Sequence, residues 1–435
     1  MVFRFIFLLI IFAGFIVWVD YLNPGDVKIV LPGGIFFEPG KMALMLSSAI
    51  FGALVVLLGF YIKATGEFFH NWKITRDRQK DAKIQTLYSK GLNALLSRRS
   101  DLAASYFEKV LAIKPNHAET LLRLGSIYSK EGDYAEAIKL HQRAKNIDEQ
   151  NIETLFALAL DYEDARRTED ALQTLEDIIE KDEGNLRALT KIRDIHQRMG
   201  SFEKAEDAQQ RILKLNLRPK EREAEQQRLV GLRYETARTL LEEGNLEKSK
   251  RIFKGLVKAE KAFVPASLGL GEVYLEEGEN AEAAGLWEEA FRTTGSIIFL
   301  HRLEDLYLKL GTPARIINLY KSALLKSPKD VNLSFFLGKL YYRLEMVDDA
   351  YETLSAIDTS TRQLTDLHKL LGNLYLRRGS YPMAVDEFKK ALTYGDQLIV
   401  PYRCCNCEHF STEWSGRCPR CGKWNTFNID LDKYC

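Results

Sequence analysis

Five of the six cysteines of this chain lie in one short stretch, "CCNCEHFSTEWSGRCPRC", at residues 404–421. Two pairs in this stretch have the spacing Cys-x2-Cys: Cys404 with Cys407, and Cys418 with Cys421. A Cys-x2-Cys turn brings two thiolates together, and two such turns complete a tetrahedral site without an open position. The spacing therefore predicts one structural metal ion held by these four thiolates.

Zinc is the expected metal, because a closed site of four thiolates stabilises a small fold that has little apolar core of its own. Iron is the alternative, since four thiolates also hold iron in rubredoxin-like sites. Disulfides are a third interpretation, and the cytoplasmic location indicated by the flanks of the apolar segments argues against them. Cys405 and Cys435 fall outside the set of four, and His409 is only a substitute ligand.

The residues before this stretch repeat with a period of 34, from residue 84 to about residue 398. Small residues recur at the eighth and twentieth positions of a unit and an aromatic residue at the eleventh, as in Gly125, Ala137 and Tyr128. Such a period is typical of paired helices that stack as a solenoid, and it resembles the tetratricopeptide repeat. We expect nine units, with an insertion near 216–226, starting at Ile84, Ala118, Ile152, Leu186, Val230, Val264, Ile297, Val331 and Thr365.

The first helices of such units line a concave surface on which partner proteins bind. In the last two units, the positions expected on this surface carry basic and aromatic side chains. We expect these side chains to hold an acidic segment of a partner, and the alternative is an ordinary solvated face. The residues are Lys339, Tyr342, Arg343, Lys369 and Arg377.

The cysteine-rich ribbon, at residues 401–430, follows the last unit after a short link. Because the link is short and a repeat array needs its terminal apolar face covered, we expect the ribbon to dock on the last repeats. Trp414 and Trp424 would form this contact and one wall of the partner site. Stacking of the two indoles on nucleic acid is the alternative, but the net charge of +1 argues against a nucleic-acid-binding protein.

Two apolar runs precede the repeats, at about residues 2–20 and 42–62. Helices of these lengths reach roughly 27 and 31 Å, which suffices to cross a hydrocarbon core. A signal peptide is the other interpretation of the first run, but no cleavage-site pattern follows it. The basic residues from Lys63 to Lys83 indicate that the chain after the second run is cytoplasmic. We therefore expect a membrane hairpin within residues 1–80.

Together these features predict an all-α fold: a transmembrane hairpin, a tetratricopeptide-repeat superhelix and a small rubredoxin-like zinc ribbon. The combination resembles the lipopolysaccharide assembly protein B family of Gram-negative bacteria, through "YRCCNC" at 402–407, "CPRCGKWNTF" at 418–427 and the repeat at 124–142. Residues 1–80 resemble the two-helix lipopolysaccharide assembly protein A family. Glu408 is a departure, since rubredoxin-like turns usually have glycine there, and we expect it to open the first turn.

The resemblance implies an adaptor on the cytoplasmic face of the bacterial inner membrane that regulates lipopolysaccharide synthesis and assembly. It implies proteins of that pathway as partners, among them the committed lipid A deacetylase and the FtsH-type membrane protease, and it leaves a homo-oligomer open. No nucleophile motif, phosphate-binding loop or pair of catalytic carboxylates stands out in the sequence, so we expect no enzyme activity. The alternatives are an iron-containing redox module and a general peptide-binding co-chaperone at the inner membrane.

Overall fold

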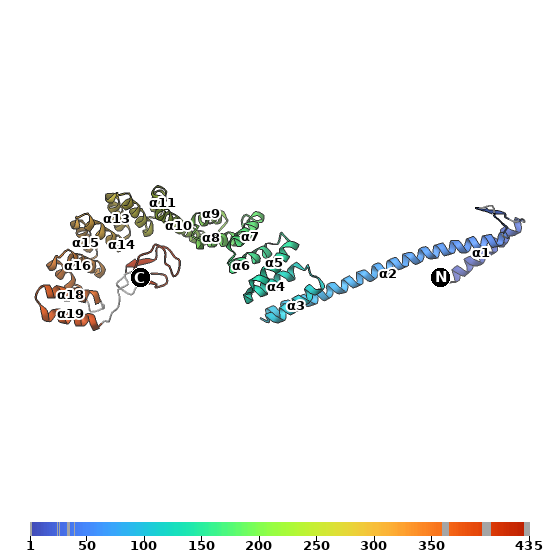
Figure 1. The fold of residues 1–435 in the computed structure, drawn as a ribbon, viewed down its shortest axis with the longest axis horizontal. Coiled ribbons are helices and arrows are strands. Elements are labelled where there is room, and N and C mark those ends of the chain that lie inside the picture. The colour runs from blue at the N-terminus through green and yellow to red at the C-terminus, as the bar shows by residue number, and fades with distance from the viewer. Residues whose placement is uncertain are drawn as a thin grey trace. The chain divides into compact units, whose positions relative to one another are not determined.

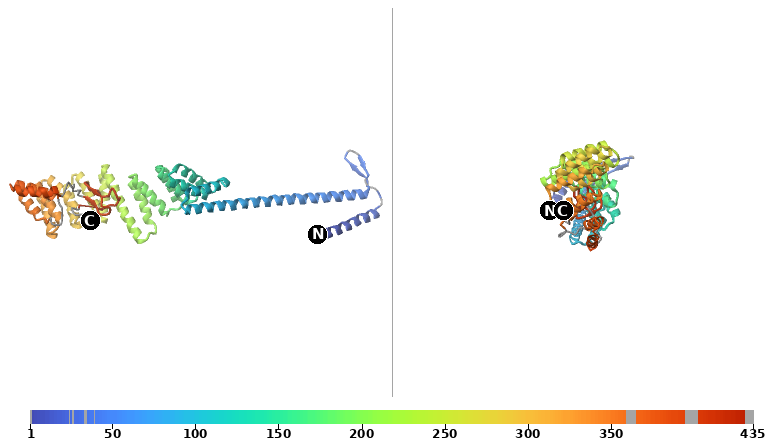
Figure 2. Two further views of the ribbon diagram at one scale, coloured as in Figure 1. Left: turned by 90° about the horizontal axis from the view of Figure 1, so that it is seen from below. Right: turned by 90° about the vertical axis from the view of Figure 1, so that its left-hand side faces the viewer.

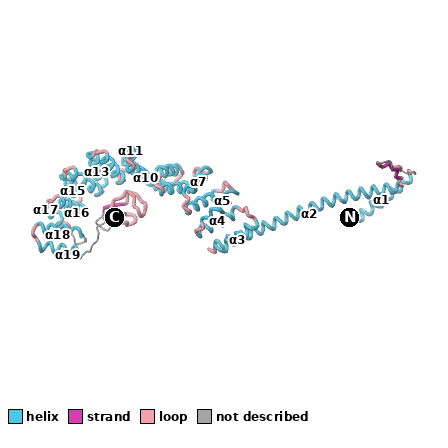
Figure 3. The backbone as a smooth tube through the Cα atoms, in the orientation of Figure 1, coloured by secondary structure: helices cyan, strands magenta, loops and turns pink. Residues whose placement is uncertain are grey.

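Helices dominate the fold, and strands occur in two small sheets (Figure 3). The chain divides into two compact units, Met1–Asp161 and Tyr162–Cys435. The computed structural model describes residues 2–23, 25, 27–32, 35–38, 40–358, 365–393 and 402–429.

Two helices and a β-hairpin precede the repeats. Helix α1 (Val2–Leu22) leads into an antiparallel pair of short strands, β1 (Ile29–Leu31) and β2 (Ile35–Phe37). Helix α2 (Lys41–Leu96) is 56 residues long. It runs without a break, as Figure 2 shows. The second apolar run and the first helix of the first expected repeat, which starts at Ile84, are therefore parts of one helix.

The two amino-terminal helices, α1 and α2, contain the two apolar runs of the sequence. Within the described residues, no helix is both long enough and apolar enough to cross the roughly 30 Å hydrocarbon core of a bilayer. Both predicted runs are helical, and the membrane hairpin itself stays a prediction. Large apolar side chains are exposed on both helices, among them Phe12 and Phe15 of α1 and Leu54 of α2.

The remaining helices follow one another in pairs (Figure 1). The first helices of the pairs after α2 are α4 (Ala118–Glu131), α6 (Ile152–Asp164), α8 (Leu186–Arg198), α10 (Pro219–Glu242), α12 (Val264–Glu276), α14 (Ile297–Lys309), α16 (Val331–Arg343) and α18 (Thr365–Arg377). The second helices are α3 (Ser100–Ile113), α5 (Tyr134–Ile147), α7 (Thr168–Lys181), α9 (Phe202–Lys214), α11 (Leu246–Ala259), α13 (Asn280–Thr294), α15 (Pro313–Lys326), α17 (Val347–Ser355) and α19 (Tyr381–Thr393).

The expected unit starts mark helix starts in most of the array. Every expected start except Ile84 and Val230 is the first residue of a helix. Val230 lies inside α10, because the inserted residues lengthen that helix at its amino-terminal end to 24 residues. Pro219 occupies the first helical position, where its fixed φ favours a helix start and its missing N–H costs nothing.

Close contact between the two helices of a pair explains the small residues of the repeat. A Cβ atom at Gly125 would lie 2.6 Å from the ring of His141, and one at Gly271 would lie 2.1 Å from the indole of Trp287. In each case the large side chain lies 16 residues later, on the second helix. The alanines of the twentieth position are all fully buried, namely Ala103, Ala137, Ala171, Ala205, Ala283, Ala350 and Ala384.

The cysteine-rich ribbon contains a three-stranded antiparallel sheet in the order β4-β3-β5. The strands are β3 (Tyr402–Cys404), β4 (Phe410–Ser411) and β5 (Phe427–Ile429). Cys404 pairs with Phe427 in this sheet, and both side chains are buried. The sheet therefore fixes the first cysteine of the first turn against the end of the ribbon.

Candidate metal centre and its dock on the repeats

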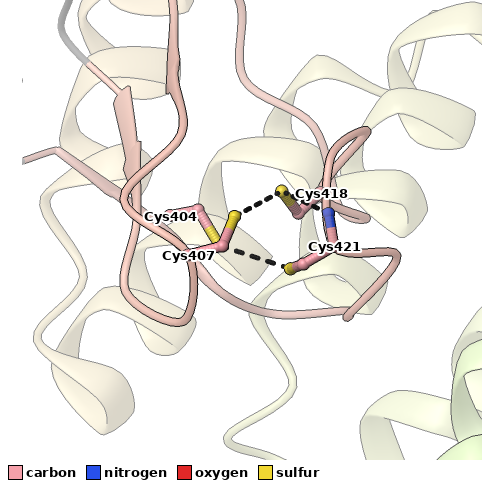
Figure 4. A group of neighbouring side chains, drawn as sticks. All are labelled: Cys404, Cys407, Cys418 and Cys421. Carbon is pink, nitrogen blue, oxygen red and sulfur yellow. Dashed lines mark hydrogen bonds between the residues drawn. The ribbon is translucent and has the colours of Figure 1, made fainter.

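The four predicted ligands converge at one point of the ribbon (Figure 4). The sulfur atoms of Cys404, Cys407, Cys418 and Cys421 all lie within 4.8 Å of one another. Cys404 Sγ lies 3.7 Å from Cys421 Sγ, and Cys407 Sγ lies 3.6 Å from Cys418 Sγ. Four sulfurs bound tetrahedrally at zinc–sulfur distances of about 2.3 Å would stand about 3.8 Å apart. The cluster therefore fits one metal ion.

The two cysteine turns share one backbone pattern. In each turn, the N–H of the first cysteine, Cys404 or Cys418, donates to the carbonyl five residues later over 2.8 Å. The N–H four residues later donates back to the carbonyl of that cysteine, also over 2.8 Å. The residue that supplies this N–H has a left-handed backbone in both turns, with φ of 58° at Glu408 and 70° at Gly422.

Glu408 thus adopts the conformation that glycine would adopt, and the expectation that it opens the first turn is wrong. A left-handed backbone costs a residue with a side chain about 1–2 kcal/mol. The carboxylate of Glu408 offsets part of this cost through an ion pair with Arg403, whose Nη2 lies 3.1 Å away. The first turn keeps its shape because its two backbone hydrogen bonds, between Cys404 and His409 and between Glu408 and Cys404, fix it.

The surroundings of the sulfurs affect their ionisation unequally. Burial opposes ionisation of Cys404, but hydrogen bonds from the Thr426 hydroxyl and from the N–H groups of Asn406 and Cys407 outweigh it and lower the pKa of Cys404 to about 6. Burial raises the pKa of the Cys407 thiol to about 12. Four adjacent thiolates need a cation to remain ionised together, and a bound metal ion supplies that charge. The donor set fits such an ion and suits both zinc and iron.

The other candidate ligands near the turns stand apart from the four sulfurs. Cys405 is exposed, and its N–H donates to the Thr426 carbonyl over 2.8 Å. The imidazole of His409 lies edge-to-face against Phe427, with 6.3 Å between ring centroids. Cys435 falls outside the described residues.

The ribbon docks on helix α10 through Trp424. The indole N–H of Trp424 donates to Oε1 of Glu235 over 2.9 Å. The indole ring covers Gly231 so closely that a Cβ atom there would lie 2.3 Å from it. On its other side the ring carries the guanidinium of Arg417, centred 5.1 Å from the ring centroid. Trp424 is therefore enclosed between its own ribbon and α10.

Further contacts hold the ribbon on the fifth to seventh units. A Cβ atom at Gly416 would lie 2.3 Å from the hydroxyl of Tyr234, a buried side chain of α10 whose pKa is raised by burial. The side-chain amide of Asn425 donates to the Ala262 carbonyl over 3.2 Å. Tyr402 and Trp414 pack against the core formed by α12 to α18, and β5 lies against α14.

The expectation that the ribbon caps the last repeats is therefore wrong. The indole of Trp424 needs a flat helix surface and a hydrogen-bond acceptor one turn away. Helix α10 supplies the first at Gly231 and the second at Glu235. The eight residues between α19 and β3 also permit this, because an extended chain of that length spans up to roughly 26–29 Å.

The predicted partner-binding residues of α16 and α18 take different roles. Lys339 is exposed. Lys369 is half-exposed and lies 3.7 Å from Asp366. The guanidinium of Arg377 stacks on the ring of Tyr342 at 5.0 Å. These four side chains are thus accessible on the first helices of the last two units.

Arg343 differs from the others because it is tied to a buried carboxylate. It forms an ion pair with Glu304 of α14, whose side chain is only 5% exposed, and lies 3.8 Å from Asp305. Removing one partner of a buried ion pair is strongly destabilising. Arg343 is therefore a structural residue of the repeat stack.

Sequence analysis missed the two residues that receive the ribbon, Gly231 and Glu235. One signal for Gly231 was present: it stands at the second position of its unit, where the repeat does not require a small residue. Glu235 gave no such signal, since a glutamate in a charged helix is ordinary. Only 4% of this residue is exposed, and Trp424 of the ribbon bonds its carboxylate.

The tetratricopeptide repeat family matches this chain at residues 116–184, 234–296 and 307–374. Lipopolysaccharide assembly protein B of Escherichia coli K12 is 22% identical over 394 residues, which cover 86% of this chain and 97% of that protein. The proteins of the same name from the O6:H1 and O157:H7 strains match equally.

Solved structures with lower similarity include a tetratricopeptide repeat protein from Parabacteroides merdae, 18% identical with a TM-score of 0.32, which covers 68% of this chain and 99% of its own. The structure of Naa15/Naa10 bound to HypK-THB is 12% identical with a TM-score of 0.40 and covers 72% of this chain and 64% of its own. The helix pairs, the four-cysteine cluster and the similarity along most of the chain agree. The chain is a tetratricopeptide-repeat protein and a distant homologue of lipopolysaccharide assembly protein B.

Proposed function

We propose that this protein is a non-enzymatic adaptor that regulates lipopolysaccharide biosynthesis and assembly at the bacterial inner membrane. The homology to lipopolysaccharide assembly protein B supports the pathway, and tetratricopeptide repeats support a role in binding other proteins. The adaptor would hold the committed lipid A deacetylase and present it to an FtsH-type protease on the cytoplasmic face. The boundaries 84–398 for the repeats and 401–430 for the ribbon remain predictions.

One observation supports the position of the client site. The ribbon lies on units five to seven, while basic side chains stand exposed on the first helices of units eight and nine. Side-chain exposure is 51% at Lys369 and 42% at Arg377, and Lys339 is exposed as well. An acidic client segment would lie along these residues, with the docked ribbon as its neighbour.

Charge reversal in the full-length protein tests this site. Lys339→Glu with Lys369→Glu should weaken deacetylase binding at least tenfold and leave the melting temperature nearly unchanged, because exposed charges contribute only about 0–1 kcal/mol each to folding. Arg343 is left intact, since its reversal would unfold the stack around Glu304.

A matched control is Lys130→Glu with Lys220→Glu, two exposed lysines outside α16 and α18 and the turns before them, with the same change in net charge. Equal deacetylase binding by the test variant and the control would show that Lys339 and Lys369 belong to an ordinary solvated surface and do not bind the client. Loss of binding in both variants would show a general charge effect and would also contradict the site.

We propose zinc as the structural ion. A redox module with iron in the same four thiolates is the competing function, because the donor set suits both metals. Metal analysis of the protein purified from its native membranes separates the two. Zinc in a one-to-one ratio supports the adaptor, whereas iron with thiolate charge-transfer absorption supports the redox module.

A further inference from the structure

Helix α11 carries a stripe of basic side chains on its exposed face. Lys248, Arg251, Lys254 and Lys258 follow one another at steps of three, three and four residues, and all four are exposed. Residues at these steps share one face of a helix. Lys261 extends the stripe in the turn that follows α11.

These five cations stand close together and lack acidic partners. In the part of the chain that the structure describes, no carboxylate lies within ion-pair distance of any of them. Lys250, one turn before Lys254, is paired with Glu277 and Glu279 at 2.5 and 3.3 Å, and both lysines lie over the ring of Tyr274. The whole chain carries a net charge of only +1, so the stripe is a local excess.

An apolar cavity of about 210 Å³ opens beside this stripe. Lys254, Lys258 and Lys261 stand among its lining residues, and Glu289 is the acidic residue there. The cavity lies between α11, α12 and α13. Its apolar walls are Val257, Leu270, Leu286 and Ala290.

We propose that this surface binds an anionic phospholipid of a membrane, with the headgroup phosphate on the lysines and part of an acyl chain in the cavity. Clusters of four or more basic side chains on a helix are attracted to anionic lipid surfaces, and an apolar cavity next to them suits an acyl chain. Nucleic acid fits less well, because the lining contains no aromatic side chain on which a base could stack. The proposal concerns α11 and is separate from the client site on α16 and α18.

The test uses the full-length protein reconstituted in nanodiscs of phosphatidylcholine alone or of phosphatidylcholine and phosphatidylglycerol in equal parts. Hydrogen exchange of α11 is measured in both kinds of nanodisc. The apolar helices α1 and α2 meet lipid in both, so a difference at α11 reports the phosphatidylglycerol headgroup. We expect slower exchange of α11 only with phosphatidylglycerol, and loss of the difference at high salt, which screens exposed charges. Equal exchange in both lipids would overturn the proposal.

Charge reversal then assigns the effect to the stripe. Lys254→Glu with Lys258→Glu should remove the protection of α11 and weaken binding to phosphatidylglycerol vesicles at least about tenfold, since each basic side chain near an anionic surface contributes roughly fivefold. The control Lys130→Glu with Lys220→Glu should behave as the unchanged protein. If the control loses as much α11 protection and vesicle binding as the test variant, the stripe is not a lipid site. The same holds if Lys258→Gln alone already unfolds the protein, because the stripe then has a structural role.

Two soluble probes separate the alternatives. Dioctanoyl phosphatidylglycerol should slow exchange in α11 and also in α13, which forms the far wall of the cavity, whereas glycerophosphoglycerol, which lacks acyl chains, should leave α13 unchanged. Equal effects of the two probes on α13 would contradict the acyl-chain site. A single-stranded RNA that protects α11 where phosphatidylglycerol does not would identify a nucleic-acid surface and overturn the lipid proposal.

Discussion

The indole of Trp424 donates a hydrogen bond to the carboxylate of Glu235 across 189 residues of sequence. The bond joins the ribbon that carries the cysteine cluster to the middle of the repeat stack. Glu235 is buried, so the indole is part of what makes its charge tolerable in that position. The metal centre and the repeat surface are therefore parts of one folded body.

Replacing the indole should reveal how strongly this bond couples the two parts. Trp424→Phe keeps an aromatic ring on Gly231 but leaves the buried Glu235 carboxylate without its donor, which should cost about 1–3 kcal/mol of unfolding free energy. Glu235→Gln in the same background should cost much less than it does alone. Chemical denaturation of the four proteins of this cycle gives the coupling energy, and additive effects would mean that the bond contributes nothing.

A side chain at Gly231 should displace the ribbon. Gly231→Leu places atoms where the indole now lies, and we expect faster hydrogen exchange around Trp424 and in α10 while the other helices stay protected. Gly285→Leu is the matched control, because a Cβ atom at Gly285 of α13 would meet nothing within 4 Å. Unchanged exchange of the ribbon in folded Gly231→Leu would show that the contact on α10 does not hold it.

Metal removal should loosen the repeat surface at the dock and not at the end of the array. Cys404→Ser with Cys407→Ser removes two ligands, and because metal binding stabilises such ribbons by about 10–16 kcal/mol in peptides, the ribbon should unfold. Hydrogen exchange should then rise in α10 and in the turn at Ala262, with α18 and α19 unchanged. Faster exchange confined to α18 and α19 would instead support a terminal cap.

Glycine at position 408 should stabilise the first cysteine turn. Glu408→Gly removes the strain of a left-handed glutamate, worth about 1–2 kcal/mol, and gives up the exposed half of an ion pair worth about 0–1 kcal/mol. We expect slower metal loss to a chelator and a higher melting temperature of the ribbon. Gly422→Glu is the converse change and should speed metal loss, and a loss of stability in Glu408→Gly would mean that the Arg403 pair outweighs the strain.

Acid should weaken the repeats in part through Glu163. Burial raises the pKa of this carboxyl, but hydrogen bonds from Arg198 and Lys191 outweigh burial and hold it below the usual value of 4.5. A group whose pKa is lower in the folded state contributes stability above the unfolded pKa and loses it as pH falls through the folded pKa. Glu163→Gln should therefore lower stability at neutral pH and flatten its decline below about pH 4.5 in thermal melts. If the loss of thermal stability at acidic pH is the same in Glu163→Gln as in the unchanged protein, Glu163 does not contribute to it.

The repeat phase could be predicted from the sequence because it follows from local sterics. Gly271 must be small since Trp287, 16 residues later, covers it, and the same contact with the same spacing returns at Gly91, Gly125, Gly338 and Gly372. The cysteine cluster could be predicted for a similar reason, since two short turns carry all the ligands. The dock of Trp424 could not, because it depends on how far a link reaches and on which helix face lacks a side chain. Both are properties of the folded array.

The position of the ribbon has a consequence for how the protein is made. Helix α10 leaves the ribosome long before Trp424 is synthesised. The surface around Gly231 and Glu235 is therefore not covered by the ribbon while the later helices form. A chain that stops after α19 has its whole set of repeats and still exposes the buried carboxylate of Glu235. Completion of the ribbon therefore covers this surface, and a quality-control protease or chaperone that recognises the uncovered surface would distinguish copies with a folded ribbon from copies without one.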